Sequence, residues 1–270
     1  MLVVKLLINQ QSSFVNRQSE SVMAGHNKWS SIKHRKGAQD AKRGKIFTRI
    51  AKEITIAARE GGGDPEFNAS LRLAIDKGKA ANMPKDNIER ALKRGTGELE
   101  GGQLEEILYE GYGPHGVGII IECVTDNRNR SVAEVRSTLT KNGGNMATSG
   151  AEAWQFEHKG FILVDGYEDE DELFMMAAEA GADDVQFDEG AASIFMEKDN
   201  FAAVRNEIQN AGLKITEANL IYDPENVMDL ETKQAVQVMK VIEKLEDLDD
   251  VQNVYSALNI TDEVIAGMEE

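Results

Sequence analysis

The residues of this chain best suited to chemistry are basic, and most of them lie close together near the N-terminus. Lysine and arginine side chains neutralise phosphates, and each such contact steepens the dependence of log affinity on log salt by about 0.7 to 0.9. A tryptophan in the same segment could stack on a base or a ribose. The pattern predicts a nucleic-acid-binding segment that contacts the phosphate backbone with little sequence specificity. Its candidate residues are Lys28, Trp29, Lys33, His34, Arg35, Lys36, Lys42, Arg43 and Lys45.

Two alternatives for this basic segment stay open. The cationic side chains could simply be solvated, although their number favours polyanion binding. Trp29 taken alone is better explained as a hydrophobic residue that fixes the segment onto the following helices, because tryptophan is on average highly buried.

A second basic group contains Arg128 and Arg130, between a predicted strand and a predicted helix, with Arg136 one or two turns later. These guanidinium groups could bind phosphate or carboxylate. Equally, Asp126 or Asn129 could cap the helix while Arg128 and Arg130 pair with acidic residues of the same chain. The sequence leaves these two interpretations balanced.

The sequence motifs that could indicate catalysis or cofactor binding are better explained by structural roles. A literal G-x-G-x-x-G occurs at Gly111, Gly113 and Gly116, but Pro114 and the apolar run after it predict a β-hairpin instead of the strand–helix turn that holds a dinucleotide. The single cysteine, Cys123, lies in an apolar strand pattern and is predicted to be a buried, inert thiol. We therefore predict no catalytic residue, no cofactor and no enzymatic activity.

Metal binding is not predicted either. The chain has one cysteine and 4 histidines, with no set at zinc spacing. Adjacent aspartates at Asp183–Asp184 and Asp249–Asp250 could bind a cation, but solvated turns explain them better because no further oxygen ligands are evident. One cysteine also excludes an internal disulfide, which fits a reducing compartment.

Charge is divided unevenly along the chain. The net charge of −17 hides a basic segment, residues 23–95, with 17 Lys or Arg and 8 Asp or Glu, followed by residues 96–270 with 11 and 38. This division predicts that the first module meets a polyanion, while the acidic remainder faces solvent or basic protein surfaces. The absence of a long apolar run argues against a membrane partner, and we predict a cytoplasmic protein.

Hydrophobic periodicity predicts a helical unit followed by mixed α and β structure. Ile46, Ile50, Ile54 and Ala58 recur every fourth residue in a first helix, and a second helix and a third, which begins at Pro84, follow. Next come strands at 104–112 and 117–125, a helix at 131–141 and a strand at 153–156. The order β-α-β-β-α-β then covers 161–222, and a helix at 232–245 and a strand at 251–257 end the pattern.

The predicted fold class is α+β and multidomain: an N-terminal three-helix unit and two α/β sandwich domains, one of them ferredoxin-like and inserted in the other. The last helix and strand are expected to return to the first sheet, which otherwise has too little helix to cover it. Met175 and Met176 are predicted to pack in the core. The predicted divisions are a disordered tail or over-long gene start at 1–22, a basic helical domain at 23–97, a discontinuous α+β domain at 98–157 and 224–263, and the inserted domain at 158–223.

Several multi-residue motifs resemble those of the YebC/PmpR family. They are MAGHNKWSSIKHRKG at 23–37, DAKRGK at 40–45, ANMPKDNI at 81–88, YEGYGP at 109–114 and TDNRNR at 125–130. The resemblance runs from Met23 to about Ile260 and implies three domains with the same insertion. It also favours Met23 as the start, because residues 1–22 depart from the family pattern.

The resemblance also implies a function. Members of the family are described as transcriptional regulators that bind DNA, whereas mitochondrial relatives resemble translational activators and some bacterial ones act at the ribosome. The prediction is a noncatalytic nucleic-acid-binding regulator of gene expression, of the DNA-binding type. The alternative is a translation factor that binds ribosomal RNA or tRNA, with ribosomal proteins as further partners.

Overall fold

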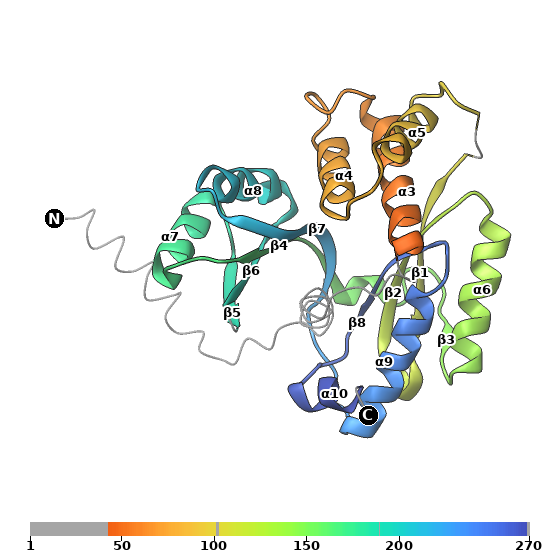
Figure 1. Ribbon diagram of the computed structural model, residues 1–270. Helices are drawn as coiled ribbons and strands as arrows, with labels where there is room; N and C mark the ends of the chain where they lie inside the picture. Colours follow the sequence, from red (N-terminus) through yellow and green to blue (C-terminus); the bar gives the residue numbers. More distant parts are fainter. Residues whose placement is uncertain (1–42, 101–102, 189, 269–270) are drawn as a thin grey trace.

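The computed structural model describes residues 43–100, 103–188 and 190–268 (Figure 1). Its first part is a helical unit of α3 (Arg43–Gly61), α4 (Ala69–Ala80) and α5 (Lys85–Gly95). The predicted stripe on the first helix is buried, with Ile50 and Ile54 packed against Leu71 of α4 and Ala91 of α5. Buried apolar area of this kind is the main stabilising contribution to so small a unit.

The first sheet has the strand order β3-β1-β2-β8 and is antiparallel throughout. Its strands are β1 (Glu105–Tyr112), β2 (Gly118–Thr125), β3 (Asn145–Met146) and β8 (Val251–Ser256). One face packs against α6 (Arg128–Lys141) and α9 (Thr232–Glu246), and α10 (Asp262–Gly267) packs on α9. Because β8 pairs with β2, the last strand does return to this sheet, as predicted.

The second sheet has the order β5-β6-β4-β7, the strand order of a ferredoxin-like domain. Its strands are β4 (Phe156–Asp165), β5 (Asp184–Asp188), β6 (Ala191–Glu197) and β7 (Lys214–Pro224). The helices α7 (Glu170–Ala180) and α8 (Phe201–Asn210) cover one face through a common apolar core. Helix α7 ends where Gly181 adopts a φ of 105°, a conformation that glycine tolerates and other residues rarely adopt.

The faces of the two sheets that carry no helices are joined by one apolar cluster. Ile120 and Tyr255 of the first sheet share this cluster with Phe161, Phe195 and Ile221 of the second. Each sheet therefore buries one face under its own helices and part of the other face against its neighbour. The fold is the predicted one, with a ferredoxin-like domain inserted in another α/β domain.

Local predictions failed at a few positions. Residues 153–155 form a short 3-10 turn, η3, instead of a strand, and only Phe156 of that prediction begins β4. Met176 packs on the core as expected, but Met175 is 53% exposed on α7. Strand β3 and helix α10 were not predicted. No helix in the described part of the chain is both long and apolar enough to cross a membrane.

Candidate nucleic-acid interface

The first half of α3 is bound to the end of α9 by its basic side chains. Lys45 Nζ lies 3.0 Å from the Asp247 carboxylate and 2.8 Å from the Asp247 carbonyl oxygen. Arg49 donates a hydrogen bond to the carbonyl of Glu246, in the last turn of α9. Cations are stabilised at a helix C-terminus, where the unpaired carbonyls carry partial negative charge. These residues hold the helical unit against the first sheet domain.

Asp250 joins three segments of the chain. Its side chain is only 5% exposed and accepts hydrogen bonds from Lys52 Nζ at 2.9 Å, Thr125 Oγ1 at 2.9 Å and Arg130 Nη2 at 2.8 Å. Burial alone would raise the pKa of Asp250, but the hydrogen bonds from Lys52, Arg130 and Thr125 lower it below its usual value. The carboxylate therefore stays ionised and fastens α3 to the beginning of α6.

The start of α6 differs from its predicted form. Asn127 is the N-cap residue, and its side-chain oxygen accepts a hydrogen bond from the backbone N–H of Arg130 at 3.1 Å. The prediction of Asp126 or Asn129 as the cap was therefore wrong, because Asn127 is the residue with the extended backbone that a cap requires. Asp126 instead accepts a hydrogen bond from Arg130 at 2.9 Å.

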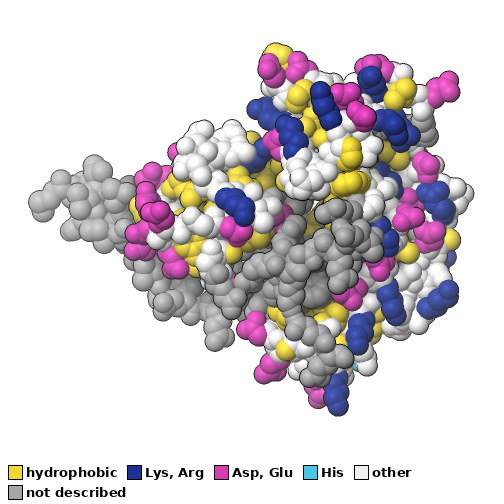
Figure 2. Space-filling model, in the orientation of Figure 1, with side chains coloured by type: hydrophobic (Ala, Val, Ile, Leu, Met, Phe, Trp, Pro, Cys, Tyr) yellow, Lys and Arg dark blue, Asp and Glu magenta, His cyan; other side chains and the backbone are white. Residues whose placement is uncertain are grey.

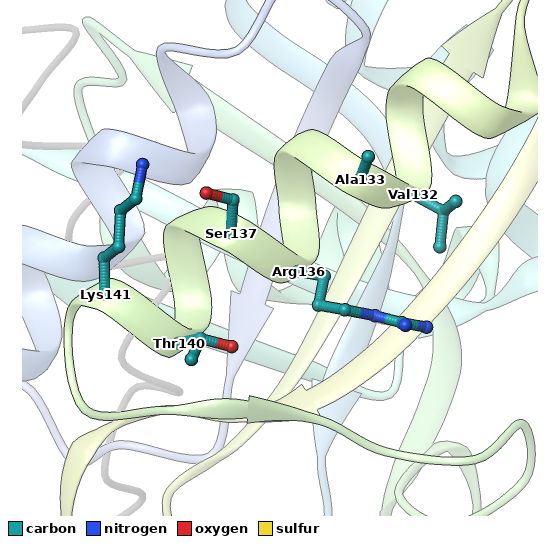
Figure 3. A pocket seen from close by; sticks show the side chains of 6 residues that line it. All are labelled: Val132, Ala133, Arg136, Ser137, Thr140 and Lys141. Atoms are coloured by element: carbon teal, nitrogen blue, oxygen red, sulfur yellow. The ribbon is translucent and has the colours of Figure 1, made fainter.

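Helix α6 exposes three cations on different sides of its axis. Arg128, Arg136 and Lys141 are exposed and form no ion pair with any residue that the structure describes. At about 1.5 Å and 100° per residue, the three positions span roughly 20 Å along the helix, and Lys141 lies about 140° round the axis from Arg136. Figure 3 shows Arg136 extended away from the helix axis beside a shallow pocket that Val132 and Thr140 also line.

A second shallow pocket connects α6 with the turn after α9. Ala133 and Ser137 line it from the helix, and Asp247 and Asp249 line it from the turn. Since Lys45 binds Asp247, the first turn of α3 lies beside this pocket. Lys or Arg side chains recur along the α6 side of the molecule and over the helical unit, among Asp and Glu (Figure 2).

The structure places the predicted site residues in four different situations. Lys45 and Arg130 are paired with acidic residues of the chain, and Arg128 is exposed on α6. Arg43 begins α3. The candidates outside the described residues are Lys28, Trp29, Lys33, His34, Arg35, Lys36 and Lys42.

The two predicted basic groups, represented by Lys45 and Arg130, lie about 85 residues apart in the sequence. Both groups contact residues 247–250, Lys45 through Asp247 and Arg130 through Asp250. Three further cations of this region, Arg49, Lys52 and Lys141, were not predicted as site residues. The spacing of Lys45, Arg49 and Lys52 by four and then three residues places them on one side of a helix, and that signal could have identified them as a group.

Helix α5 adds a third group of cations. Arg90, Lys93 and Arg94 are exposed around its last two turns and have no ion pair within the described ranges. Lys85, at the other end of the helix, pairs with Glu89 at 3.5 Å. Lys93 and Arg94, in the last turn, stabilise the helix through the partial negative charge at its C-terminus, and their side chains remain exposed to solvent.

The groups that the sequence offered for chemistry have structural positions in the described part of the chain. Cys123 is buried, and desolvation raises the pKa of its thiol to about 12, so it remains protonated. The glycines at 111, 113 and 116 belong to the β1–β2 hairpin, which turns at Pro114–Gly116, as predicted. The described residues contain no group of three or more His, Cys, Asp or Glu side chains placed to hold a metal ion.

This fold and site define a class of α+β protein with an N-terminal helical unit, an inserted ferredoxin-like sheet and exposed Lys and Arg side chains. Family models match two parts of the chain: the TACO1/YebC N-terminal domain at residues 27–98 and the TACO1/YebC second and third domains at residues 104–258. The chain belongs to the TACO1/YebC family.

Individual relatives match over most of their length. A probable transcriptional regulatory protein of Geobacter sulfurreducens is 53% identical over 89% of this chain and 98% of its own. One from Halothermothrix orenii is 50% identical over 92% of this chain and 100% of its own. The crystal structure of a conserved hypothetical protein from Aquifex aeolicus superposes with a TM-score of 0.78 at 43% identity, covering 84% of this chain and 94% of that one.

Proposed function

We propose that the protein is a noncatalytic, nucleic-acid-binding regulator of gene expression. The names of its relatives, probable transcriptional regulatory proteins, support regulation. The observation that carries the proposal is the exposure of Arg128, Arg136 and Lys141 on α6, none of which pairs with a described acidic residue. The basic segment with Lys33, Arg35 and Lys36 precedes α3 in the sequence, and we propose that it supplies further phosphate contacts.

The cations of this surface have different roles. Lys45, Lys52 and Arg130 hold the domains together through Asp247 and Asp250, so their charge is already partly compensated. The exposed cations of α6 and α5 contact phosphates. Because phosphate contacts position a protein without reading bases, binding is expected to be weakly sequence-specific and strongly salt-dependent.

The first test reverses two charges on α6. Arg128→Glu with Arg136→Glu should weaken binding to labelled duplex DNA or structured RNA and reduce the salt slope by about 1.4 to 1.8, the value for two phosphate contacts. Folding should be little affected, since both side chains are exposed and a glutamate in the first turn suits the helix dipole. Fluorescence anisotropy at several salt concentrations measures both quantities.

The matched control makes the same charge change elsewhere. Lys198 and Lys214 are exposed on the ferredoxin-like domain, so Lys198→Glu with Lys214→Glu changes the net charge equally. We expect this control to alter affinity much less and to leave the slope unchanged. Equal losses in both double variants would mean that only net charge matters, and the α6 surface would be wrong.

A translation factor is the second candidate, and the division of charge between a basic first segment and acidic later domains favours it. Apart from Asn129, α6 carries no Asn or Gln, so base reading from this helix would fall to its arginines. Contacts limited to the backbone suit structured RNA, which is recognised largely by shape. The acidic domains could then face basic ribosomal proteins.

Sedimentation separates the two candidates. In a DNase-treated lysate at low salt, a translation factor should travel with ribosomal particles, and Lys33→Glu with Arg35→Glu and Lys36→Glu should return it to the free fractions. A transcriptional regulator should instead stay in the free fractions after DNase and retain DNA fragments in an untreated pull-down.

A further inference from the structure

Trp154 is unusual because it is 70% exposed and yet fixed in position. Tryptophan is highly buried on average, so an ordered, exposed indole indicates an interaction surface. The indole N–H donates a hydrogen bond to the carbonyl of Ala151 at 2.8 Å. This bond ties the ring to the residues just before η3 (Ala153–Gln155), the turn that carries Trp154 and connects the two sheet domains.

A buried carboxylate holds the turn that carries Trp154. Glu110 of β1 is 4% exposed and accepts hydrogen bonds from the backbone N–H groups of Gly150 at 2.6 Å, Glu152 at 2.7 Å and Ala153 at 2.9 Å. The side chain of Gln155 donates to the Glu152 carboxylate at 2.8 Å. A turn held in this way loses little conformational entropy on binding a partner, which favours affinity.

The surroundings of Trp154 are acidic. The chain at the end of β7 lies beside this turn. The backbone N–H of Glu225 donates a hydrogen bond to the carbonyl of Gln155 at 2.8 Å, and Phe156 pairs with Pro224. Residues 147–157 and 224–231 contain five Asp or Glu, of which Glu225, Asp229 and Glu231 are exposed. Glu152 is buried, and Glu157 pairs with Lys159 at 2.8 Å. Such a surface repels phosphates and attracts cations. It differs in this respect from the basic α6 surface.

We propose that Trp154 and these two acidic segments form a docking surface for a Lys- or Arg-rich segment of a partner protein. The face of an indole binds guanidinium and ammonium groups, and the surrounding carboxylates pair with neighbouring cations of the same segment. The inference goes beyond nucleic-acid binding, because it assigns a protein partner to a surface that is chemically opposite to α6.

Peptide binding to the full chain tests the proposal. The probe is a fluorescein-labelled 12-residue peptide of alternating arginine and glycine, measured by anisotropy at low salt. Trp154→Ala should weaken its binding about three-fold, as expected for an exposed cation–π contact of roughly 0.5–1 kcal/mol. Trp154→Phe should retain most of the affinity. Met175→Ala, which truncates another exposed apolar side chain, should bind as the parent does.

A second measurement locates the contact. The chain has 2 tryptophans, so Trp29→Phe leaves Trp154 as the only one, and the arginine peptide should change its fluorescence while a glutamate–glycine peptide should not. Unchanged affinity in Trp154→Ala would overturn the proposal, because binding would then depend only on net charge. An equal loss in Met175→Ala would do the same. If Trp154→Ala weakened only a labelled single-stranded oligonucleotide, the indole would stack on bases, and the assigned partner would be wrong.

Discussion

Replacing Asp250 by asparagine should destabilise the protein more than any other single charge removal at the α3–α6 junction. The carboxylate is almost completely buried and bonded to Lys52, Thr125 and Arg130. Removing one member of a buried ion pair leaves its partners uncompensated, which costs about 3 to 5 kcal/mol. Arg130 is 45% exposed and can be partly solvated again, so we expect the lower end of that range, about 3 kcal/mol.

The neighbouring aspartate provides the control. Asp249 is exposed, and its backbone carbonyl accepts a hydrogen bond from Lys52. Asp249→Asn therefore removes the same charge as Asp250→Asn but keeps the contact with Lys52. Urea unfolding at pH 7 should show little change in Asp249→Asn, about 0.5 kcal/mol or less. Closely similar midpoints for the two variants would contradict the role given to Asp250.

Replacing Glu110 by glutamine should give the second large effect. The carboxylate accepts three backbone hydrogen bonds within the fold, and bonds of this kind to a charged group contribute about 1.5 to 3 kcal/mol each, with strong non-additivity. A glutamine keeps one acceptor oxygen but turns an N–H group toward other donors. We expect a loss of about 2 kcal/mol in the free energy of unfolding at pH 7.

This effect should depend on pH. Burial would raise the pKa of Glu110, but the backbone hydrogen bonds from Gly150, Glu152 and Ala153 more than offset it, and the pKa is lowered. A carboxyl group with a lowered folded pKa stabilises the fold above its unfolded pKa of about 4.3, and this stabilisation is lost as pH falls through the folded pKa. The difference between the parent and Glu110→Gln should therefore be largest near neutrality and shrink below about pH 4.

Glu105, exposed on the same strand, is the matched position. Glu105→Gln should unfold like the parent protein at pH 7, so that a difference specific to Glu110 can be read directly from the urea midpoints. A gap between parent and Glu110→Gln that stayed constant down to pH 3 would mean that the charge of Glu110 does not stabilise the turn.

The sequence by itself determined most of the elements and their order. Helices α3, α7 and α9 and the strands of both sheets except β3 follow from the spacing of apolar residues, because burying one face requires a period of 3.6 in a helix and 2 in a strand. The turn at Pro114–Gly116 follows from local backbone preferences. The βαββαβ order and the shortage of helix over the first sheet together predicted the insertion. The motifs predicted the family.

Tertiary structure alone decided what the charged and aromatic side chains contact. Lys45 and Lys52 belong to a basic sequence segment, yet they bind the end of α9 and Asp250 about 200 residues later. The burial of Glu110 and the exposure of Trp154 and Met175 are likewise not visible in any local pattern. The physical reason is that local propensity acts over one or two turns, whereas the pairing and burial of a side chain depend on which distant segments pack beside it.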